Sequence, residues 1–405
     1  MSEKKAKPWH RKRHKFFQDI MALVSKGHLK NKQGFVPKPI ELPDGPVLIL
    51  CNHVCNYDPM MVGLCIKRPF YIVAMDDLTS RRFLGPILRF CFNLIPKAKS
   101  LTDYNCARIM MQLKEEGQKV LIFPEGNRTY NGKLCYIDEA TAKMLQVFHT
   151  PIAFMNIVGG YGSEPRWSGK PRKGKCHVEL RYLMQPDEVA NYNEEELMDK
   201  IREYLTVDDY SMDVPFVGKD KANYLERILF HCPDCGSNNA LYSQGDDFIC
   251  KNCGYRARYN ESLRFDLIQG KKRVETVYDW DMLDRHYLEG LDFKEEQGLI
   301  FKDEHVSISK HYTYDPPDFL LKDCTVYGYQ DRFVFENKKG RETFYFDEIS
   351  SASGVAKAKA NFYVDGQAYQ IAGAKNLNAF KYVMLYYHYK NTEEGKAGKD
   401  EYFGI

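Results

Sequence analysis

The sequence has no apolar run long enough to span a bilayer. Such a span needs about 18 to 20 apolar residues in succession, and the longest runs here, 46–51 and 120–123, have the length of a β-strand. The amino-terminal residues also lack the apolar stretch and small-residue cleavage site of a signal peptide. We therefore expect a cytoplasmic protein without a transmembrane segment.

The chain also lacks a dominant charge. Its 58 Lys and Arg residues against 55 Asp and Glu residues leave a formal net charge of +3, which argues against nucleic acid as a partner of the chain as a whole. Residues 1–33 are the exception, with ten basic residues against two acidic ones. Apolar residues at helical spacing in 9–24 predict a helix there. It either lies on an anionic membrane, at the inner face of the cell membrane, or packs its apolar stripe on the protein.

Cysteine is not scarce, but its pattern differs from that of a secreted protein. Of the 12 cysteines, four form two CxxC pairs and the other eight are scattered. We expect these eight to be reduced packing residues, as is usual in the cytoplasm.

The length and the changes in composition predict several domains. At 405 residues the chain is too long for one ordinary core. The expected segments are a basic amphipathic membrane-surface segment (1–33), an α/β domain (34–207), a linker (208–228), a four-cysteine module (229–258), a β-rich domain with a terminal helix (259–395) and a tail (396–405).

Residues 46–205 alternate short apolar runs with helical segments. This alternation predicts an α/β fold with a largely parallel sheet flanked by helices. The first strand, 47–51, leads into a loop with His53 and Asp58, five residues apart. Ligands bind at this end of the strands in open α/β sheets. Asp58 followed by Pro59 is also a good start for a helix, so the pair alone has a structural interpretation too.

A second motif follows the strand predicted at 120–123. It reads Phe123-Pro124-Glu125-Gly126-Asn127-Arg128-Thr129. Together the two motifs resemble the NHxxxxD and FPEGxR signature of the glycerolipid acyltransferases, typified by the 1-acyl-sn-glycerol-3-phosphate acyltransferases. The resemblance covers roughly residues 10–206.

The resemblance implies a division of roles among these residues. His53 is the general base for the acceptor hydroxyl and Asp58 orients it, as in a Ser/His/Asp triad. We expect backbone N–H groups at the start of the helix after Asp58 to stabilise the oxyanion. The substrate-binding residues implied are Glu125, Gly126, Asn127, Arg128 and Thr129, with Lys97 where the family usually has an Arg. Lysine keeps the charge but loses the bidentate fork, which leaves the acceptor headgroup open.

The four-cysteine module predicts a metal site. Cys232 and Cys235 are followed, after fourteen residues, by Cys250 and Cys253. This spacing is typical of a structural Zn²⁺ site in a zinc ribbon. Iron at the same sulfurs, or two redox dithiols, are the alternatives. Zinc ribbons often contact nucleic acid, but nearby acidic residues offset Lys251, Arg256 and Arg258.

The aromatic strand-like runs of 264–371, followed by a helical stretch at 376–389, predict an antiparallel sheet capped by one helix. This order resembles a pleckstrin-homology-like domain.

The sequence thus predicts an acyltransferase of phospholipid biosynthesis. It would move a fatty acyl group from acyl-CoA or acyl carrier protein to a lysophospholipid, with lysophosphatidic acid to phosphatidic acid as the leading case. Two alternatives remain: another lysolipid or an amino-acid lipid as acceptor, and a non-catalytic zinc-ribbon adaptor that binds a protein or nucleic acid partner.

Overall fold

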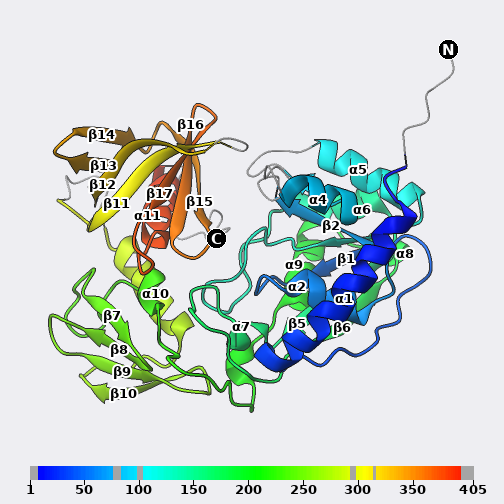
Figure 1. The fold of residues 1–405 in the computed structure, drawn as a ribbon, viewed down its shortest axis with the longest axis horizontal. Coiled ribbons are helices and arrows are strands. Elements are labelled where there is room, and N and C mark those ends of the chain that lie inside the picture. Colours follow the sequence, from blue (N-terminus) through cyan, green and yellow to red (C-terminus); the bar gives the residue numbers. More distant parts are fainter. Residues whose placement is uncertain (1–7, 76–83, 98–103, 292–297, 313–315, 394–405) are drawn as a thin grey trace. The chain divides into compact units, whose positions relative to one another are not determined.

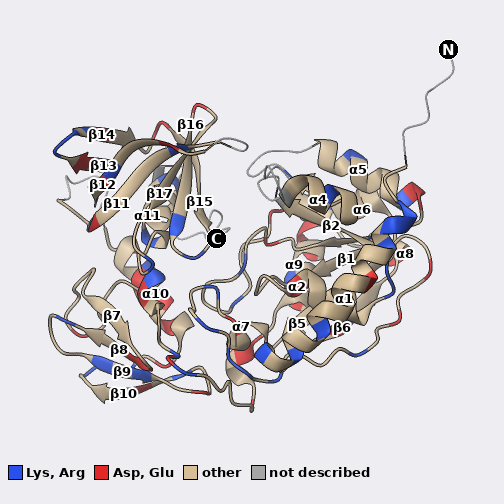
Figure 2. Cartoon of the chain, in the orientation of Figure 1, with Lys and Arg blue, Asp and Glu red and all other residues tan. Residues whose placement is uncertain are grey.

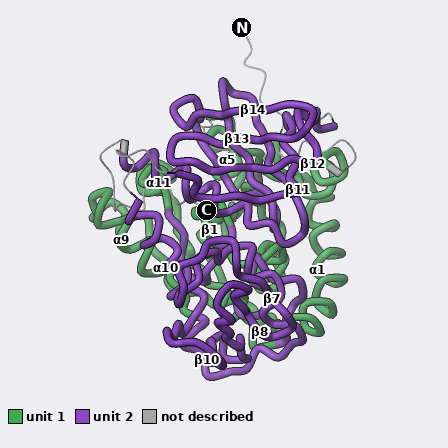
Figure 3. The backbone as a smooth tube through the Cα atoms, turned by 90° about the vertical axis from the view of Figure 1, so that its left-hand side faces the viewer, with its two compact units in different colours: residues 1–127, 137–160, 174–208 green, residues 128–136, 161–173, 209–405 purple. Residues whose placement is uncertain are grey.

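The computed structural model describes residues 8–75, 84–97, 104–291, 298–312 and 316–393 (Figure 1). The backbone divides into two compact units (Figure 3). Unit 1 contains residues 1–127, 137–160 and 174–208, and unit 2 contains 128–136, 161–173 and 209–405. The division falls inside the second sequence motif, between Asn127 and Arg128. Each unit is described by itself below.

Unit 1 is built on a six-stranded sheet with the strand order β3-β2-β4-β1-β5-β6. Neighbouring strands from β3 to β5 pair in parallel, and only β6 is antiparallel to its neighbour β5. The predicted α/β fold with a largely parallel sheet is therefore confirmed. The strands are β1 (Leu48–Cys51), β2 (Phe70–Met75), β3 (Ile95–Lys97), β4 (Lys119–Ile122), β5 (Ile152–Val158) and β6 (His177–Met184).

The central strands are apolar on both faces because helices cover the sheet. All four residues of β1 are fully buried. The helices of this part of the chain are α1 (Lys12–Gln33), α2 (Asp58–Cys65), α4 (Leu84–Cys91), α5 (Tyr104–Glu115), α6 (Ala140–Phe148), α7 (Gly160–Ser163), which spans the unit division, α8 (Pro186–Val189) and α9 (Glu194–Leu205).

Helix α1 packs on unit 1 with its polar side. Its buried residues are His14, Gln18, Ala22, Ser25, Leu29 and Gln33. Gln18 donates to the carbonyl oxygen of Phe70 and accepts from the N–H of the same residue. The helix therefore does not pack its apolar stripe on the protein, which was one of the two interpretations of this segment. No described helix is both long enough and apolar enough to cross a bilayer.

The described residues of unit 2 form two antiparallel sheets and two short 3₁₀ helices, η1 (Asp209–Ser211) and η2 (Leu225–Arg227). The smaller sheet has the order β10-β9-β8-β7, with β7 (Leu241–Gln244), β8 (Asp247–Cys250), β9 (Arg256–Tyr259) and β10 (Phe265–Gln269). Helix α10 (Val277–Glu289) follows it. Trp280 of α10 packs its indole edge to face against Phe248, Tyr255 and Phe265, which gives this small sheet an aromatic core.

The larger sheet has the order β14-β13-β12-β11-β17-β16-β15, with antiparallel pairing throughout. Its strands are β11 (Phe301–His311), β12 (Asp318–Gly328), β13 (Arg332–Asn337), β14 (Gly340–Tyr345), β15 (Ile349–Val355), β16 (Lys359–Val364) and β17 (Gln367–Ala372), followed by α11 (Phe380–Glu393). The predicted antiparallel sheet followed by one helix is confirmed, and its resemblance to a pleckstrin-homology-like domain stays a prediction.

Candidate active site and metal centre

His53 and Asp58 form a partly buried pair at the carboxyl end of β1. His53 follows the strand in a short loop, and Asp58 is the first residue of α2. Nδ1 of His53 lies 2.6 Å from Oδ2 of Asp58. The side chain of His53 is 21% exposed, whereas that of Asp58 is fully buried. An ionised carboxylate only accepts hydrogen bonds, so a neutral imidazole in this contact carries its proton on Nδ1 and keeps the lone pair of Nε2 available.

The carboxylate of Asp58 also organises the loop that carries His53. Its oxygens accept hydrogen bonds from the N–H groups of Val54 and Cys55, at 2.7 and 3.0 Å. The Cys55 thiol lies 3.0 Å from Oδ1. Asp58 and Pro59 begin α2, as the sequence predicts; Tyr57 is at the cap position, and the carboxylate of Asp58 turns back toward the preceding loop. One side chain therefore fixes both the backbone of the loop and the orientation of the imidazole.

The second motif contributes a tether and a flat surface to this pair. Oε1 of the buried Glu125 accepts a hydrogen bond of 2.6 Å from the N–H of His53. The ring of Phe123 stacks on the imidazole, with a centroid separation of 4.4 Å. Gly126 supplies the turn with a φ of 65°. Phe123 and Cys55 were not predicted as site residues, although both lie inside the quoted motifs.

The backbone donors expected for the oxyanion are already used. The N–H groups of Met60 and Met61 both donate to the carbonyl oxygen of Tyr57 at 2.9 Å, and Pro59 has no N–H. The expectation that the first turn of α2 holds the oxyanion is therefore wrong for these groups.

The remaining predicted substrate residues are divided between the two units. Exposed Lys97 is the last residue of β3 and lies at the same edge of the parallel sheet as His53, and Asn127 is buried in unit 1. Arg128 and Thr129 belong to unit 2. The hydroxyl of Thr129 donates to the carbonyl oxygen of Lys133 at 2.7 Å and accepts from the N–H of Gly132, so it closes a turn. Substrate binding by these four residues stays a prediction.

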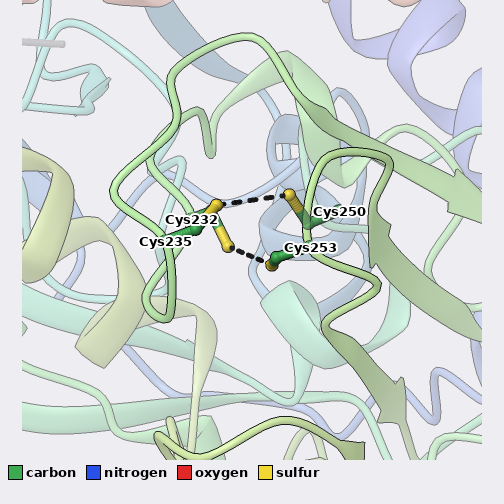
Figure 4. Close-up of side chains that lie close together, drawn as sticks. All are labelled: Cys232, Cys235, Cys250 and Cys253. Carbon is green, nitrogen blue, oxygen red and sulfur yellow. Dashed lines mark hydrogen bonds between the residues drawn. The ribbon is translucent and has the colours of Figure 1, made fainter.

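The four predicted metal ligands lie together (Figure 4). The sulfurs of Cys232, Cys235, Cys250 and Cys253 are all within 4.8 Å of one another. The Cys232–Cys253 and Cys235–Cys250 sulfur pairs are 3.7 and 3.8 Å apart. A tetrahedral Zn²⁺ with Zn–S bonds of about 2.3 Å would place its sulfurs about 3.8 Å apart. The cluster therefore fits zinc.

The backbone around the cluster has the same shape in both halves. Gly236 and Gly254 follow the two CxxC pairs with φ values of 68° and 77°. Their N–H groups donate to the carbonyl oxygens of Cys232 and Cys250 at 2.9 and 3.0 Å. His231, next to the first cysteine, bonds Asn238 and stacks on Tyr287, so its ring is engaged outside the cluster.

Helix α10 holds the segment that leads into the first cysteine of the cluster. Asp284 is fully buried, and its carboxylate accepts from the N–H groups of Phe230 and His231 at 3.0 Å. Burial raises the pKa of this carboxyl well above its ordinary range. The indole N–H of Trp280 donates to the carbonyl oxygen of His231 at 2.9 Å. The segment that enters the cluster is thus fixed by hydrogen bonds as well as by the cysteines.

Comparison with known proteins gives the same two assignments. Residues 30–158 match the family model described as "Acyltransferase". Residues 226–261 match a zinc-ribbon family model described as "DNA directed RNA polymerase, 7 kDa subunit". The resemblance to acyltransferases predicted from the motifs and the added zinc-ribbon module are both confirmed.

Two curated relatives carry acyltransferase names. A probable 1-acyl-sn-glycerol-3-phosphate acyltransferase of Mycoplasma pneumoniae is 24% identical over 40% of this chain and 62% of its own length. A 1-acyl-sn-glycerol-3-phosphate acyltransferase of Borreliella burgdorferi is 26% identical over 24% of this chain and 40% of its own length. The chain thus spans less than two thirds of either relative.

A solved structure is also similar to part of the chain. It is the 1-acyl-sn-glycerophosphate (LPA) acyltransferase, PlsC, from Thermotoga maritima, at 17% identity and a TM-score of 0.40, covering 47% of this chain and 78% of that one.

Proposed function

We propose that this protein transfers a fatty acyl group from a thioester donor to the free hydroxyl of a lysophospholipid, with lysophosphatidic acid as the leading acceptor. The observation that carries the proposal is the His53–Asp58 pair, held by Glu125 at the carboxyl edge of the sheet. The matches to acyltransferases support the reaction class.

The proposed reaction needs no covalent enzyme intermediate. Nε2 of His53 takes the proton of the acceptor hydroxyl while its oxygen attacks the thioester carbonyl carbon. The tetrahedral intermediate collapses, the C–S bond breaks, and the imidazolium returns the proton to the departing thiolate. An ester and a free thiol result. Asp58 stabilises the transient imidazolium and keeps the ring in the reactive tautomer.

The phosphate of the acceptor is assigned to Arg128, with Glu125, Gly126, Asn127 and Thr129 shaping its loop. The guanidinium fork of Arg128 suits a phosphate. Lys97 is a second cation at the sheet edge, exposed at the end of β3. Acyl-CoA and acyl carrier protein are both candidate donors, and the four cysteines hold a structural Zn²⁺.

A test of the reaction uses the full chain with lysophosphatidic acid and either acyl-CoA or acyl carrier protein thioester. His53→Ala should lower kcat by about 10²- to 10⁴-fold. The matched control is His305→Ala, because His305 forms an exposed pair with Asp323 at 2.8 Å. Full activity in His53→Ala would exclude this mechanism. A panel of other lysolipids and amino-acid lipids decides the acceptor.

The rival class is a non-catalytic adaptor that uses the zinc ribbon to bind a protein or nucleic acid. The intact His53–Asp58 pair favours the enzyme, because an adaptor has no need of a base held in one tautomer. Wild-type protein without acyl transfer to any acceptor of the panel would favour the adaptor instead.

We further propose that α1 and α4 place the protein on the anionic inner surface of the membrane. The outward side of α1 exposes Phe16, Ile20, Leu23 and Val24, and α4 exposes Ile87 and Phe90. The two helices meet where the rings of Phe17 and Phe90 contact, at a centroid separation of 5.9 Å. Lys and Arg residues lie along the same helix α1 (Figure 2). Exposed apolar side chains beside basic ones suit an anionic bilayer.

Flotation of the full chain with vesicles tests this surface. Binding should need anionic lipid, weaken with salt, and fall in Leu23→Ser/Val24→Ser. Val147→Ser on α6 is the matched control, because Val147 is similarly exposed at 70%. Binding that is indifferent to lipid charge and to the α1 substitutions would contradict the proposal.

A further inference from the structure

The segment 128–136, which directly continues the second motif, is held by residues far along the chain. Nδ2 of Asn131 donates to Asp281 of α10 at 2.8 Å. Its carbonyl oxygen accepts from the hydroxyl of Tyr210 at 2.5 Å. The ring of Tyr130 stacks on Phe380 at the start of α11, with a centroid separation of 4.2 Å. All these residues belong to unit 2.

Arg166 is the centre of this arrangement. It is 3% exposed, and its guanidinium lies over the Tyr130 ring at 4.1 Å. It donates to three carbonyl oxygens: that of Arg128 at 3.3 Å, and those of Gly354 and Ala356 at 3.1 and 3.0 Å. One planar side chain thus joins the backbone of Arg128 to the end of β15 and the turn after it. A lysine has no planar fork with which to do the same.

Gly354 allows the close approach of the two segments. A Cβ atom added at Gly354 would overlap the hydroxyl of Tyr130. The next atom it would meet is Cζ of the same ring at 3.2 Å. Strand β15 can therefore pack against Tyr130 because residue 354 is a glycine. A side chain at residue 354 would collide with the hydroxyl of Tyr130.

The surroundings of this segment are cationic. Burial lowers the pKa of Arg166; Tyr130 opposes this shift, and the nearby charge of Arg128 adds to it. Burial is also the main reason that the pKa of Lys357 is lowered, with Arg227 and Arg128 adding to the effect and Glu164 opposing it. The three hydrogen bonds of Arg166 described above go to backbone carbonyl oxygens. Several cations near one another suit an anionic ligand.

We propose that the carboxyl-terminal β domain sets the affinity of the enzyme for the phosphate of its acceptor, with Arg166 as the positioning residue that holds the backbone of Arg128. This inference rests on the proposed function, in which Arg128 binds that phosphate. The carboxyl-terminal region therefore contributes to substrate recognition, although it lies outside both acyltransferase motifs. Arg166 does not itself need to touch the substrate.

The decisive variant is Gly354→Ala in the full chain. Displacement of Tyr130 should raise KM for lysophosphatidic acid about tenfold, because small misplacements of a binding group are costly. KM for the acyl donor and kcat at saturating acceptor should stay within about twofold, because Arg128 acts on the acceptor phosphate. The KM for monoacylglycerol, an acceptor without phosphate, should be the same in Gly354→Ala as in the wild type. Gly340→Ala is the matched control, since its Cβ would lie at an ordinary 3.8 Å from Leu321.

A second substitution separates positioning from general damage. Tyr130→Phe removes the hydroxyl that the new Cβ would overlap, so Gly354→Ala/Tyr130→Phe should recover KM to within about twofold of Tyr130→Phe alone. Arg166→Met should raise the same KM at least as much, and Arg166→Lys should restore it only in part.

The outcomes separate this inference from the proposed function. An unchanged acceptor KM in Gly354→Ala, or a loss that Tyr130→Phe does not recover, would overturn the inference while acyl transfer by the wild type stands. Absence of acyl transfer by the wild type would overturn the proposed function and, with it, the acceptor role. Amide hydrogen exchange at residues 129–133 should rise in Gly354→Ala and Arg166→Met whatever the turnover, and unchanged exchange would overturn the positioning itself.

Discussion

The loops that carry the two sequence motifs are held in different ways. In the loop 52–58 the carboxylate of Asp58 binds the imidazole of His53 and two N–H groups of the same loop. The segment after Gly126 instead depends on Asp281, Gly354 and Phe380, which are more than 140 residues away in the chain. The first loop is held mainly by its own residues, whereas the second is held by residues far along the chain.

This difference explains what the sequence can predict. A histidine and an aspartate five residues apart meet over a distance that the chain spans locally, so the motif itself predicts the contact. Arg166 and Gly354 are 188 residues apart and sit in no motif. Their contact depends on the tertiary fold, which spacing does not encode.

The most direct way to test the remote support of the second loop is to remove the metal. In Cys232→Ser/Cys250→Ser the zinc should be lost, and the ribbon should lose stability on the order of 10 kcal/mol, the scale of structural zinc binding. Helix α10 contacts both the ribbon, through Asp284, and Asn131, through Asp281. The acceptor KM should therefore rise together with the loss of bound zinc.

Metal content, thermal melting and acceptor KM measure this effect. Cys91→Ser is the control, because Cys91 lies in α4 outside the cluster. A double variant that keeps the wild-type melting curve without zinc would show that the ribbon does not need the metal.

Substitution of Asp58 should disturb the first loop, because the carboxylate of Asp58 holds that loop. Asp58→Asn keeps the shape but replaces a carboxylate that accepts from His53, Val54 and Cys55 by an amide with one acceptor oxygen. The turnover number should fall about 10²- to 10⁴-fold. Asp323→Asn, in the exposed His305 pair, should leave turnover unchanged. Equal effects of the two substitutions would contradict the role of Asp58.

The comparison has to be made at a pH where unit 1 is intact. Burial, with the charges of Arg13, His10 and Arg11, lowers the pKa of His14 from 6.5 to about 4. The unfolded chain therefore binds this proton first as the pH falls. Above pH 6.5, His14 is neutral in both states and does not weaken folding. As the pH falls from 6.5 to about 4, the free energy of unfolding decreases by up to about 3 kcal/mol.

Thermal melts across this pH range measure the effect in the wild type and in His14→Gln, which should show a flatter profile. His305→Gln is the contrasting variant, because the hydrogen bond with Asp323 raises the pKa of His305. The small contribution of protonated His305 to the free energy of unfolding is present at low pH and is lost as the pH rises. An identical slope in His14→Gln and the wild type would contradict the assignment.

The smallest expected effect concerns the tether between the two motifs. Glu125→Gln keeps an acceptor for the N–H of His53 but loses the negative charge behind the 2.6 Å bond. We expect kcat to fall about tenfold, the cost of about one charge-assisted hydrogen bond. Glu179→Gln on β6 is the control, because Glu179 is a partly exposed residue on the edge strand of the same sheet. A fall as large as that in Asp58→Asn would mean that Glu125 does more than hold the backbone.

The sequence predicted the elements of the molecule better than their orientation. The parallel sheet, the four-cysteine cluster and the antiparallel region followed from periodicity and spacing, which are local properties. The helical spacing of Phe16, Ile20, Leu23 and Val24 predicted α1, but spacing cannot say which side faces the protein. The buried side proved to be that of His14, Gln18 and Ala22. Likewise, the hydroxyl of Thr129 closes a turn that the motifs do not predict.

The interleaving of the two units has a practical consequence for protein engineering. Residues 128–136 and 161–173 lie early in the chain but fold with the carboxyl-terminal half. A truncation after residue 208 would leave Tyr130, Asn131 and Arg166 without the surfaces that receive them. Expression of the amino-terminal half alone should therefore give an aggregation-prone product, and its inactivity would say nothing about His53.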